Sequence, residues 1–241
     1  MPLAPSPARR HRWPRRLGKL VLTGLVAAVL GIGVAWVATP GVDDARDRVD
    51  ALLSEHAAPA LAGELPERVV AAVLATEDSR YADHAGIDWR GALRAPYGVV
   101  TGRDLGGSTI EQQLAKNLYE GGEHDAAARA GAVVVAVKLS AAYSKDDVLR
   151  MYLDSAYFGH GLYGVTAATE GYFGLAPADL SWAQASLLAG LLQAPSAYDP
   201  LQHPELAAQR QAHVLDRLVE VGALSRVDAD AAGATSWNLL G

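Results

Sequence analysis

Residues 126–143, with the sequence AAARAGAVVVAVKLSAAY, indicate the fold class of this chain. Arg129 and Lys138 are the only charged side chains in the stretch, one near each end, and small apolar residues fill most other positions. A helix that is apolar nearly all round is typical of a protein interior. We therefore expect a buried central helix here.

Helix signals also occupy the segments on both sides of this stretch. Ser144 with Asp147, and Ser181 with Gln184, resemble capping boxes at helix starts. Apolar residues recur at helical spacing in further segments, which are 66–78, 108–118 and 204–221. No run of useful length alternates apolar and polar residues as a strand would. The sequence thus predicts an all-α domain.

Composition and charge exclude several classes of protein. Half of the 241 residues are hydrophobic, which excludes a disordered chain. The absence of cysteine excludes a disulfide framework, a thiolate metal site and a cysteine nucleophile. Residues 1–19 hold six of the 21 Lys and Arg and no acid, so 15 basic residues face 27 acidic ones in the rest of the chain. This acidic remainder argues against nucleic acid as a partner.

Residues 20–38 contain no ionisable side chain and are long enough, at 1.5 Å per residue, to cross a hydrocarbon core of about 30 Å. The positive-inside rule keeps the basic tail in the cytoplasm. A cleaved signal peptide is the alternative, but its apolar core is usually shorter and ends in an A-x-A site. The predicted organisation is a cytoplasmic tail (1–19), a transmembrane helix (20–38), a juxtamembrane connector (39–65) and an extracytoplasmic helical domain (66–241).

Two clusters of polar residues are candidates for chemistry. Residues 77–89 are rich in ionisable groups at the predicted end of an apolar helix, where a partly desolvated carboxylate suits general-base work. Residues 106–117 begin with two glycines followed by a helix start, an arrangement suited to binding phosphate or pyrophosphate. Taken singly, composition favours a solvated helix end for the first cluster, and a loop like the second is usually a turn and a cap.

Taken together, the clusters resemble motifs of glycosyltransferase family 51, the peptidoglycan glycosyltransferases of class A penicillin-binding proteins and monofunctional transglycosylases. Glu77-Asp78 with Tyr81, His84 and Gly86 is similar to E-D-x-x-F-x-x-H-x-G, with Tyr81 in place of Phe. Residues 107–117 are similar to G-S-T-x-x-Q-Q-x-x-K-N. Further motifs of the family match segments 143–164, 172–174, 188–191 and 194–200.

This resemblance implies a lysozyme-like helical fold that polymerises lipid II into β-1,4 glycan strands at the outer face of the cytoplasmic membrane. It makes Glu77 the general base and Asp78 and His84 the residues that position it. It assigns the donor pyrophosphate to a set of polar residues, Ser108, Thr109, Gln113, Lys116 and Arg129. The implied partners are lipid II, the lipid-linked growing glycan, the membrane and other cell-wall synthesis proteins. No cofactor is required, although Mg²⁺ or another divalent cation is an option for neutralising the leaving group.

One motif of the family departs from its pattern. In register, R-K-x-x-E falls on residues 128–132, where Arg129 keeps a positive charge and Ala132 replaces the second catalytic Glu. Loss of a general acid costs about 10²- to 10⁴-fold in rate, so we expect reduced activity. The alternatives are a non-catalytic lipid II binding or scaffold protein and a lysozyme-like hydrolase. The absence of an S-x-x-K motif favours a monofunctional enzyme.

Overall fold

The computed structural model describes residues 13–91, 108–119 and 126–240. The chain divides between Pro40 and Gly41 into two units. The first contains α1 (Trp13–Ala38), of which the segment Gly18–Ala38 is long and apolar enough to cross a membrane and has no buried part. The prediction of one apolar N-terminal helix is confirmed, whereas its topology stays a prediction.

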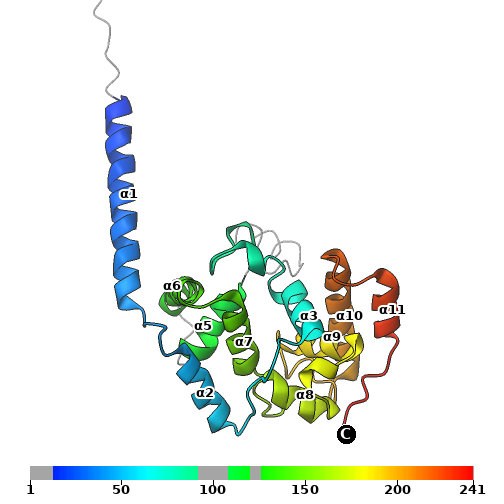
Figure 1. The fold of residues 1–241 in the computed structure, drawn as a ribbon. Coiled ribbons are helices and arrows are strands. Elements are labelled where there is room, and N and C mark those ends of the chain that lie inside the picture. Colours follow the sequence, from blue (N-terminus) through cyan, green and yellow to red (C-terminus); the bar gives the residue numbers. More distant parts are fainter. Residues whose placement is uncertain (1–12, 92–107, 120–125, 241) are drawn as a thin grey trace, which may run out of the picture. The chain divides into compact units, whose positions relative to one another are not determined.

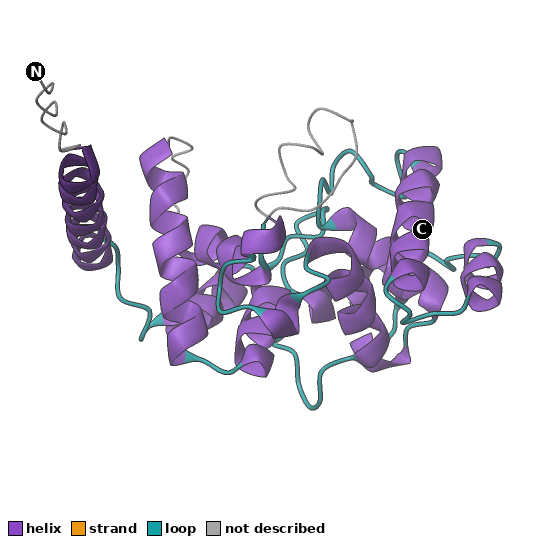
Figure 2. Ribbon diagram, turned by 90° about the horizontal axis from the view of Figure 1, so that it is seen from above, coloured by secondary structure: helices purple, strands orange, loops and turns teal. Residues whose placement is uncertain are grey.

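The second unit is built from helices (Figures 1 and 2). They are α2 (Ala45–Glu55), α3 (Glu67–Glu77), α5 (Ile110–Tyr119), α6 (Ala126–Ala142), α7 (Lys145–Ser155), α8 (Val165–Phe173), α9 (Trp182–Leu191), α10 (Pro204–Glu220) and α11 (Arg226–Gly233), with short 3₁₀ turns η1 (Tyr81–Asp83) and η2 (Pro177–Asp179). Among the described residues, strand-like pairing is limited to one isolated bridge between Tyr157 and Tyr163. The predicted all-α class is confirmed.

The helices of the second unit pack in two groups. On one side α3, α9 and α10 pack against one another, with α11 against α10. On the other side α5 packs against α6 and α7, and α2 against α7 (Figure 1). The helix α8 contacts both α7 and α9 and thereby joins the groups. The end of α3, in one group, also reaches α5 in the other, because Gln113 Nε2 donates to Glu77 Oε2.

Among the described helices, the nearly fully buried one is α9 and not, as the sequence indicated, the Ala/Val helix α6. Nine of the ten α9 residues are buried, and Ser181 with Gln184 forms the predicted capping box at its start. In α6 the buried apolar side chains lie on one face, at Ala132, Val135, Ala136 and Leu139, and Ala141 is exposed. The uniform apolar pattern did not indicate which face is buried, because exposing small apolar side chains on a helix face costs little free energy.

Part of the segment assigned to a connector packs with the domain. On α2, Ala45, Val49 and Leu53 are buried in the same core as the other helices of this unit. The hydroxyl of Tyr119 donates to Asp44 Oδ1 over 2.9 Å, so the start of α2 is tied to the end of α5.

Candidate active site

The first polar cluster forms a corner between α3 and α5. The helix α3 ends at Glu77 because Asp78 leaves helical geometry, with φ −155° and ψ 73°. The chain then approaches α6, where a Cβ on Gly86 would lie 2.6 Å from the carbonyl oxygen of Ala136. The hydroxyl of Thr109 donates to Gly86 O over 2.8 Å. Glycine is therefore required at position 86, where φ is +86°, and the loop is fixed from both sides.

The carboxylate of Glu77 is oriented by a chain of two hydrogen bonds. Gln113 Nε2 on α5 donates to Glu77 Oε2 over 2.8 Å, and the hydroxyl of Tyr152 on α7 donates to Gln113 Oε1 over 2.8 Å. Burial and, secondly, the negative charge of Glu77 raise the pKa of Tyr152, so its hydroxyl keeps its proton. The donor Tyr152 thereby fixes which end of the Gln113 amide faces the base. The Glu77 side chain is 14% exposed, so the base is held but reachable.

Asp78 connects this corner to the start of α5. Both of its carboxylate oxygens lie 3.0 Å from His84 Nε2, and Oδ2 also accepts the backbone N–H of Ile110 over 3.1 Å. Ile110 is the first residue of α5, where N–H groups lack helical partners and the helix dipole favours a negative charge. The buried Asp78 thus fixes the α3 end relative to α5.

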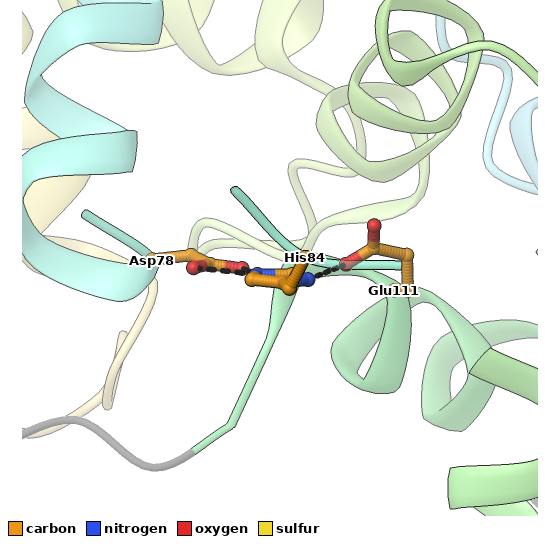
Figure 3. Close-up of side chains that lie close together, drawn as sticks. All are labelled: Asp78, His84 and Glu111. Carbon is orange, nitrogen blue, oxygen red and sulfur yellow. Dashed lines mark hydrogen bonds and ion pairs between the residues drawn. The ribbon is translucent and has the colours of Figure 1, made fainter. Parts of the chain in front are cut away.

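A second buried carboxylate lies beside this pair. Glu111 has no exposed side-chain surface, and Lys145 Nζ contacts its Oε1 at 2.7 Å. His84 lies between the carboxyl groups of Asp78 and Glu111, with Nδ1 4.0 Å from Glu111 Oε2 (Figure 3). The hydroxyl of Tyr81, which stands where the family pattern has Phe, donates to Lys145 O over 2.7 Å. These contacts join the loop, α5 and the start of α7.

A cavity of about 810 Å³ opens beside the loop. Its wall includes Arg80, Arg90 and the side chain of Trp89, which is 69% exposed, together with His84 and, from α6, Val137. A volume of this size holds a ligand much larger than a single sugar. Asp83 and Asp88 belong to the same wall, and Asp88 pairs with Arg80, so the two arginines are balanced by two acids and the charge of the wall does not select an anionic ligand.

The predicted pyrophosphate-binding residues occupy different environments. The Thr109 side chain caps α5, because its hydroxyl accepts Gln112 N over 3.2 Å while Gln112 Oε1 accepts Thr109 N over 3.1 Å. Ser108 and Lys116 are exposed, and Lys116 lies one helical turn beyond Gln113 on α5. Arg129 belongs to α6, but its side chain lies outside the described residues. The structure therefore brings Thr109 and Gln113 to the corner of the base, and the pyrophosphate role of all five stays a prediction.

Comparison with known proteins decides the family. The model of the family described as Transglycosylase matches residues 48–219. The chain belongs to this family. The match extends from within α2 to the last turn of α10 and so includes every residue of the corner described above.

Individual relatives of this transglycosylase differ in length. Penicillin-binding protein 1F of Bacillus subtilis is 38% identical over 190 residues, which are 78% of this chain and 27% of that protein. A putative transglycosylase of Cupriavidus necator is 35% identical over 224 residues, 90% of this chain and 96% of that protein. Penicillin-binding protein 1A of Mycolicibacterium smegmatis is 42% identical over 174 residues, which are 70% of this chain and 22% of that protein. The chain therefore spans about a quarter of the two penicillin-binding proteins.

A crystal structure of penicillin-binding protein 1A from Haemophilus influenzae overlaps 54% of this chain and 16% of that chain, with 26% identity and a TM-score of 0.39. The family assignment rests on the sequence matches alone.

Ala132 is the position where the sequence predicts a departure from the motif of the family, and this register stays a prediction. It is 9% exposed and belongs to the buried face of α6, the helix that packs mainly against α5. In the described part of α6, no acidic residue stands on either side of it, since the helix sequence contains none. A carboxylate for the leaving group would therefore have to come from another element.

The cluster of Asp78, His84 and Glu111 has potential ligand atoms within 4.8 Å of one another, but it does not fit a divalent cation. The oxygens of Asp78 already accept from His84 and Ile110, and Lys145 neutralises Glu111. Within this cluster, His84 Nδ1 and Glu111 Oε2 are the two buried atoms without a hydrogen-bond partner, whereas zinc needs four ligands and magnesium six. We assign no metal to this cluster.

Sequence reasoning missed several residues that surround the base. Tyr152 and Lys145 lie in the matching segment 143–164, and Glu111 lies in the second motif, yet the sequence indicated no role for them. Arg210 on α10, whose Nη2 lies 3.8 Å from Glu77 Oε1, was missed entirely. A contact between residues so far apart in sequence leaves no local pattern, so only the fold reveals it.

Proposed function

We propose that this transglycosylase is a peptidoglycan glycosyltransferase that polymerises lipid II into β-1,4 glycan strands, with turnover lowered by Ala132 at the position of the second Glu. The observation that carries the proposal is the carboxylate of Glu77, held by Gln113 and Tyr152 at the end of α3 yet partly exposed. A fixed, reachable carboxylate suits a general base.

The proposed reaction is one displacement. Glu77 takes the proton of the acceptor sugar's 4-hydroxyl, whose oxygen forms a bond to C1 of the donor sugar while the bond from C1 to the pyrophosphate oxygen breaks. The leaving pyrophosphate carries the electron pair away as negative charge. Lys116, exposed one turn from Gln113, and Arg129 supply positive charge for it. No metal is required by this scheme, and addition of Mg²⁺ or EDTA measures whether a divalent cation contributes.

The proposal places α1 across the cytoplasmic membrane and the second unit on its outer side, where lipid II and the lipid-linked glycan are held by their prenyl chains. The apolar, unburied segment Gly18–Ala38 supports this location. Other cell-wall synthesis proteins are proposed partners.

A second candidate function is a non-catalytic lipid II binding protein, favoured by Ala132 alone. Incubation of the detergent-solubilised protein with labelled lipid II separates the functions. Polymer supports the glycosyltransferase, and retention of lipid II without polymer supports the binding protein. Shortening of preformed glycan strands would indicate a lysozyme-like hydrolase.

Glu77→Gln sharpens this test. The substitution removes the proton acceptor and keeps the volume, so we expect polymerisation to fall by at least about 10²-fold while lipid II binding survives. Polymerisation rate and retention of labelled lipid II are both measured. Glu170→Gln, at an exposed position on α8, controls for the loss of one negative charge. A Glu77→Gln variant as fast as the unaltered chain would contradict the assigned base.

A further inference from the structure

A buried arginine on α10 lies beside the carboxylate of Glu77. The Arg210 side chain is 7% exposed, and its Nη2 lies 3.8 Å from Glu77 Oε1. The other carboxylate oxygen, Oε2, accepts the hydrogen bond of Gln113. The two oxygens of Glu77 thus face donors from two helices, α10 and α5, that belong to different groups of the fold.

The fold provides a fitted place for this arginine. A Cβ on Gly190 of α9 would lie 3.0 Å from Arg210 Cγ, so the absence of a side chain there makes room for the arginine stem. The guanidinium carbon lies 5.8 Å from the centre of the Tyr198 ring, within the range of a cation–π contact. Packing on both its stem and its head therefore restricts where the charge of Arg210 can be.

The position of Glu77 in α3 explains why a positive charge is needed. Glu77 is the last residue of this helix, where the negative end of the helix dipole disfavours a carboxylate. Two arginines seven positions apart on α10 face this helix end: Arg210 contacts Glu77, and Arg217 Nε donates to Ala75 O over 3.2 Å. Seven residues are close to two helical turns, so both lie on one side of α10.

We propose that Arg210 is a positioning residue that keeps Glu77 ionised and aimed at the acceptor hydroxyl. The inference rests on the proposed function, because it takes Glu77 as the base. Arg210 itself is almost fully enclosed, so it acts through Glu77 and not by binding substrate.

The charged and titratable groups around Glu77 are few in the described part of the structure. α9 has no ionisable side chain, and α7 contributes Tyr152. Next to Glu77 in the chain, Asp78 is paired with His84, and on α5 Glu111 is paired with Lys145. The same elements carry further ionisable residues along their length, which are Glu67 and Arg68 on α3, Lys116 and Tyr119 on α5, Asp146, Asp147, Arg150 and Asp154 on α7, Asp179 on η2, and Glu205, His213, Asp216, Arg217 and Glu220 on α10.

The first test is the pH dependence of lipid II polymerisation by the full chain. In Arg210→Gln the base loses its neighbouring cation, so the acidic limb of the kcat profile should move up by about one pH unit, with KM changed less than about twofold. Arg210→Lys, which keeps the positive charge, should return the acidic limb most of the way to its position in the unaltered chain. Arg217→Gln is the matched control, because it removes a cation from the same helix end without touching Glu77, and it should leave the limb in place. The inference is overturned if the acidic limb of the kcat profile does not move in Arg210→Gln, or if the variant changes only KM.

The second test does not need activity. Unfolding by urea is measured for the unaltered chain, Arg210→Gln, Glu77→Gln and the double variant at pH 7 and pH 3. We expect a coupling between the two positions at pH 7 that weakens at pH 3, because protonation of the Glu77 carboxylate removes its attraction to Arg210. Arg210→Met, which keeps the apolar stem beside Gly190, replaces Arg210→Gln if that variant does not fold. If Arg210 and Glu77 are coupled but the unaltered chain does not polymerise lipid II, the proposed function is refuted and the pairing of the two residues stands. If the two positions show no coupling, the pairing itself is refuted.

Discussion

At position 132, where the predicted motif register expects a carboxylate, the side chain is a single methyl group. If the missing acid limits turnover, Ala132→Glu should raise the polymerisation rate by about 10- to 100-fold, below the full range of a well-placed general acid. Ala132 is 9% exposed on the face of α6 that joins the core, so the new charge also costs stability unless a cation pairs with it. Single-turnover polymerisation of labelled lipid II measures the gain, and the melting temperature measures the cost.

Ala132→Gln is the control for this substitution. It adds nearly the same volume and polarity without a charge, so it should lose stability without a gain in rate. If both variants are equally fast, the added bulk and not the acid is responsible. If a well-folded Ala132→Glu is no faster than a slow unaltered chain, the deficit lies elsewhere in the site.

At the scale of elements, α7 holds the segment that leads from α2 into α3. Asp154 on α7 accepts the backbone N–H of Leu61 over 2.8 Å, and Arg150 donates to the carbonyl oxygens of Leu61 and Gly63. Asp154 is buried, and this burial raises its pKa, while the Leu61 N–H and the charge of Arg150 lower it by less. The attachment of this segment to α7 therefore depends on pH.

Asp154→Asn should remove this dependence and keep the hydrogen bond, because the amide oxygen still accepts the Leu61 N–H. A group whose folded-state pKa is raised loses its contribution to stability as pH rises through that pKa. Below the unfolded-state value of 3.8 the variant should gain least, and its advantage in unfolding free energy should grow toward pH 7. Urea unfolding at pH 3 to 7 measures the difference. An advantage that does not change with pH, or that also appears in Glu170→Gln, would contradict this account.

The same elements show what the sequence could predict. Capping signals found the starts of α7 and α9, because Ser144 and Ser181 act locally through the backbone three residues on. The pattern did not distinguish the half-buried α6 from the fully buried α9, since both are apolar nearly all round and only the positions of neighbouring helices differ. For the corner, the motifs identified Glu77 and Gln113, which lie within recognisable runs. Arg210 comes from another element and has no such run around it.

At the scale of the whole chain, charge and hydropathy are unevenly distributed. Six of the 21 basic residues lie within residues 1–19 without any acid, and the apolar segment Gly18–Ala38 follows. Acidic residues then exceed basic ones through the rest of the chain. An orientation with the tail in the cytoplasm agrees with the positive-inside rule and with the membrane potential, which opposes export of six positive charges.

This asymmetry predicts the outcome of proteolysis on intact spheroplasts. A protease added outside should digest the second unit, from Gly41 onward, and leave a short membrane-bound fragment that carries an N-terminal tag. The tag should become sensitive only after lysis, as should a cytoplasmic marker protein that serves as the control. Replacing the six basic residues of the tail by Asn should lower the fraction of chains in this orientation, because the charge difference that sets it is then lost.

Complete protection of the second unit in intact spheroplasts would show that it is cytoplasmic and would also exclude polymerisation of lipid II at the outer face. Release of that unit into the medium without added protease would indicate a cleaved signal peptide in place of an anchor.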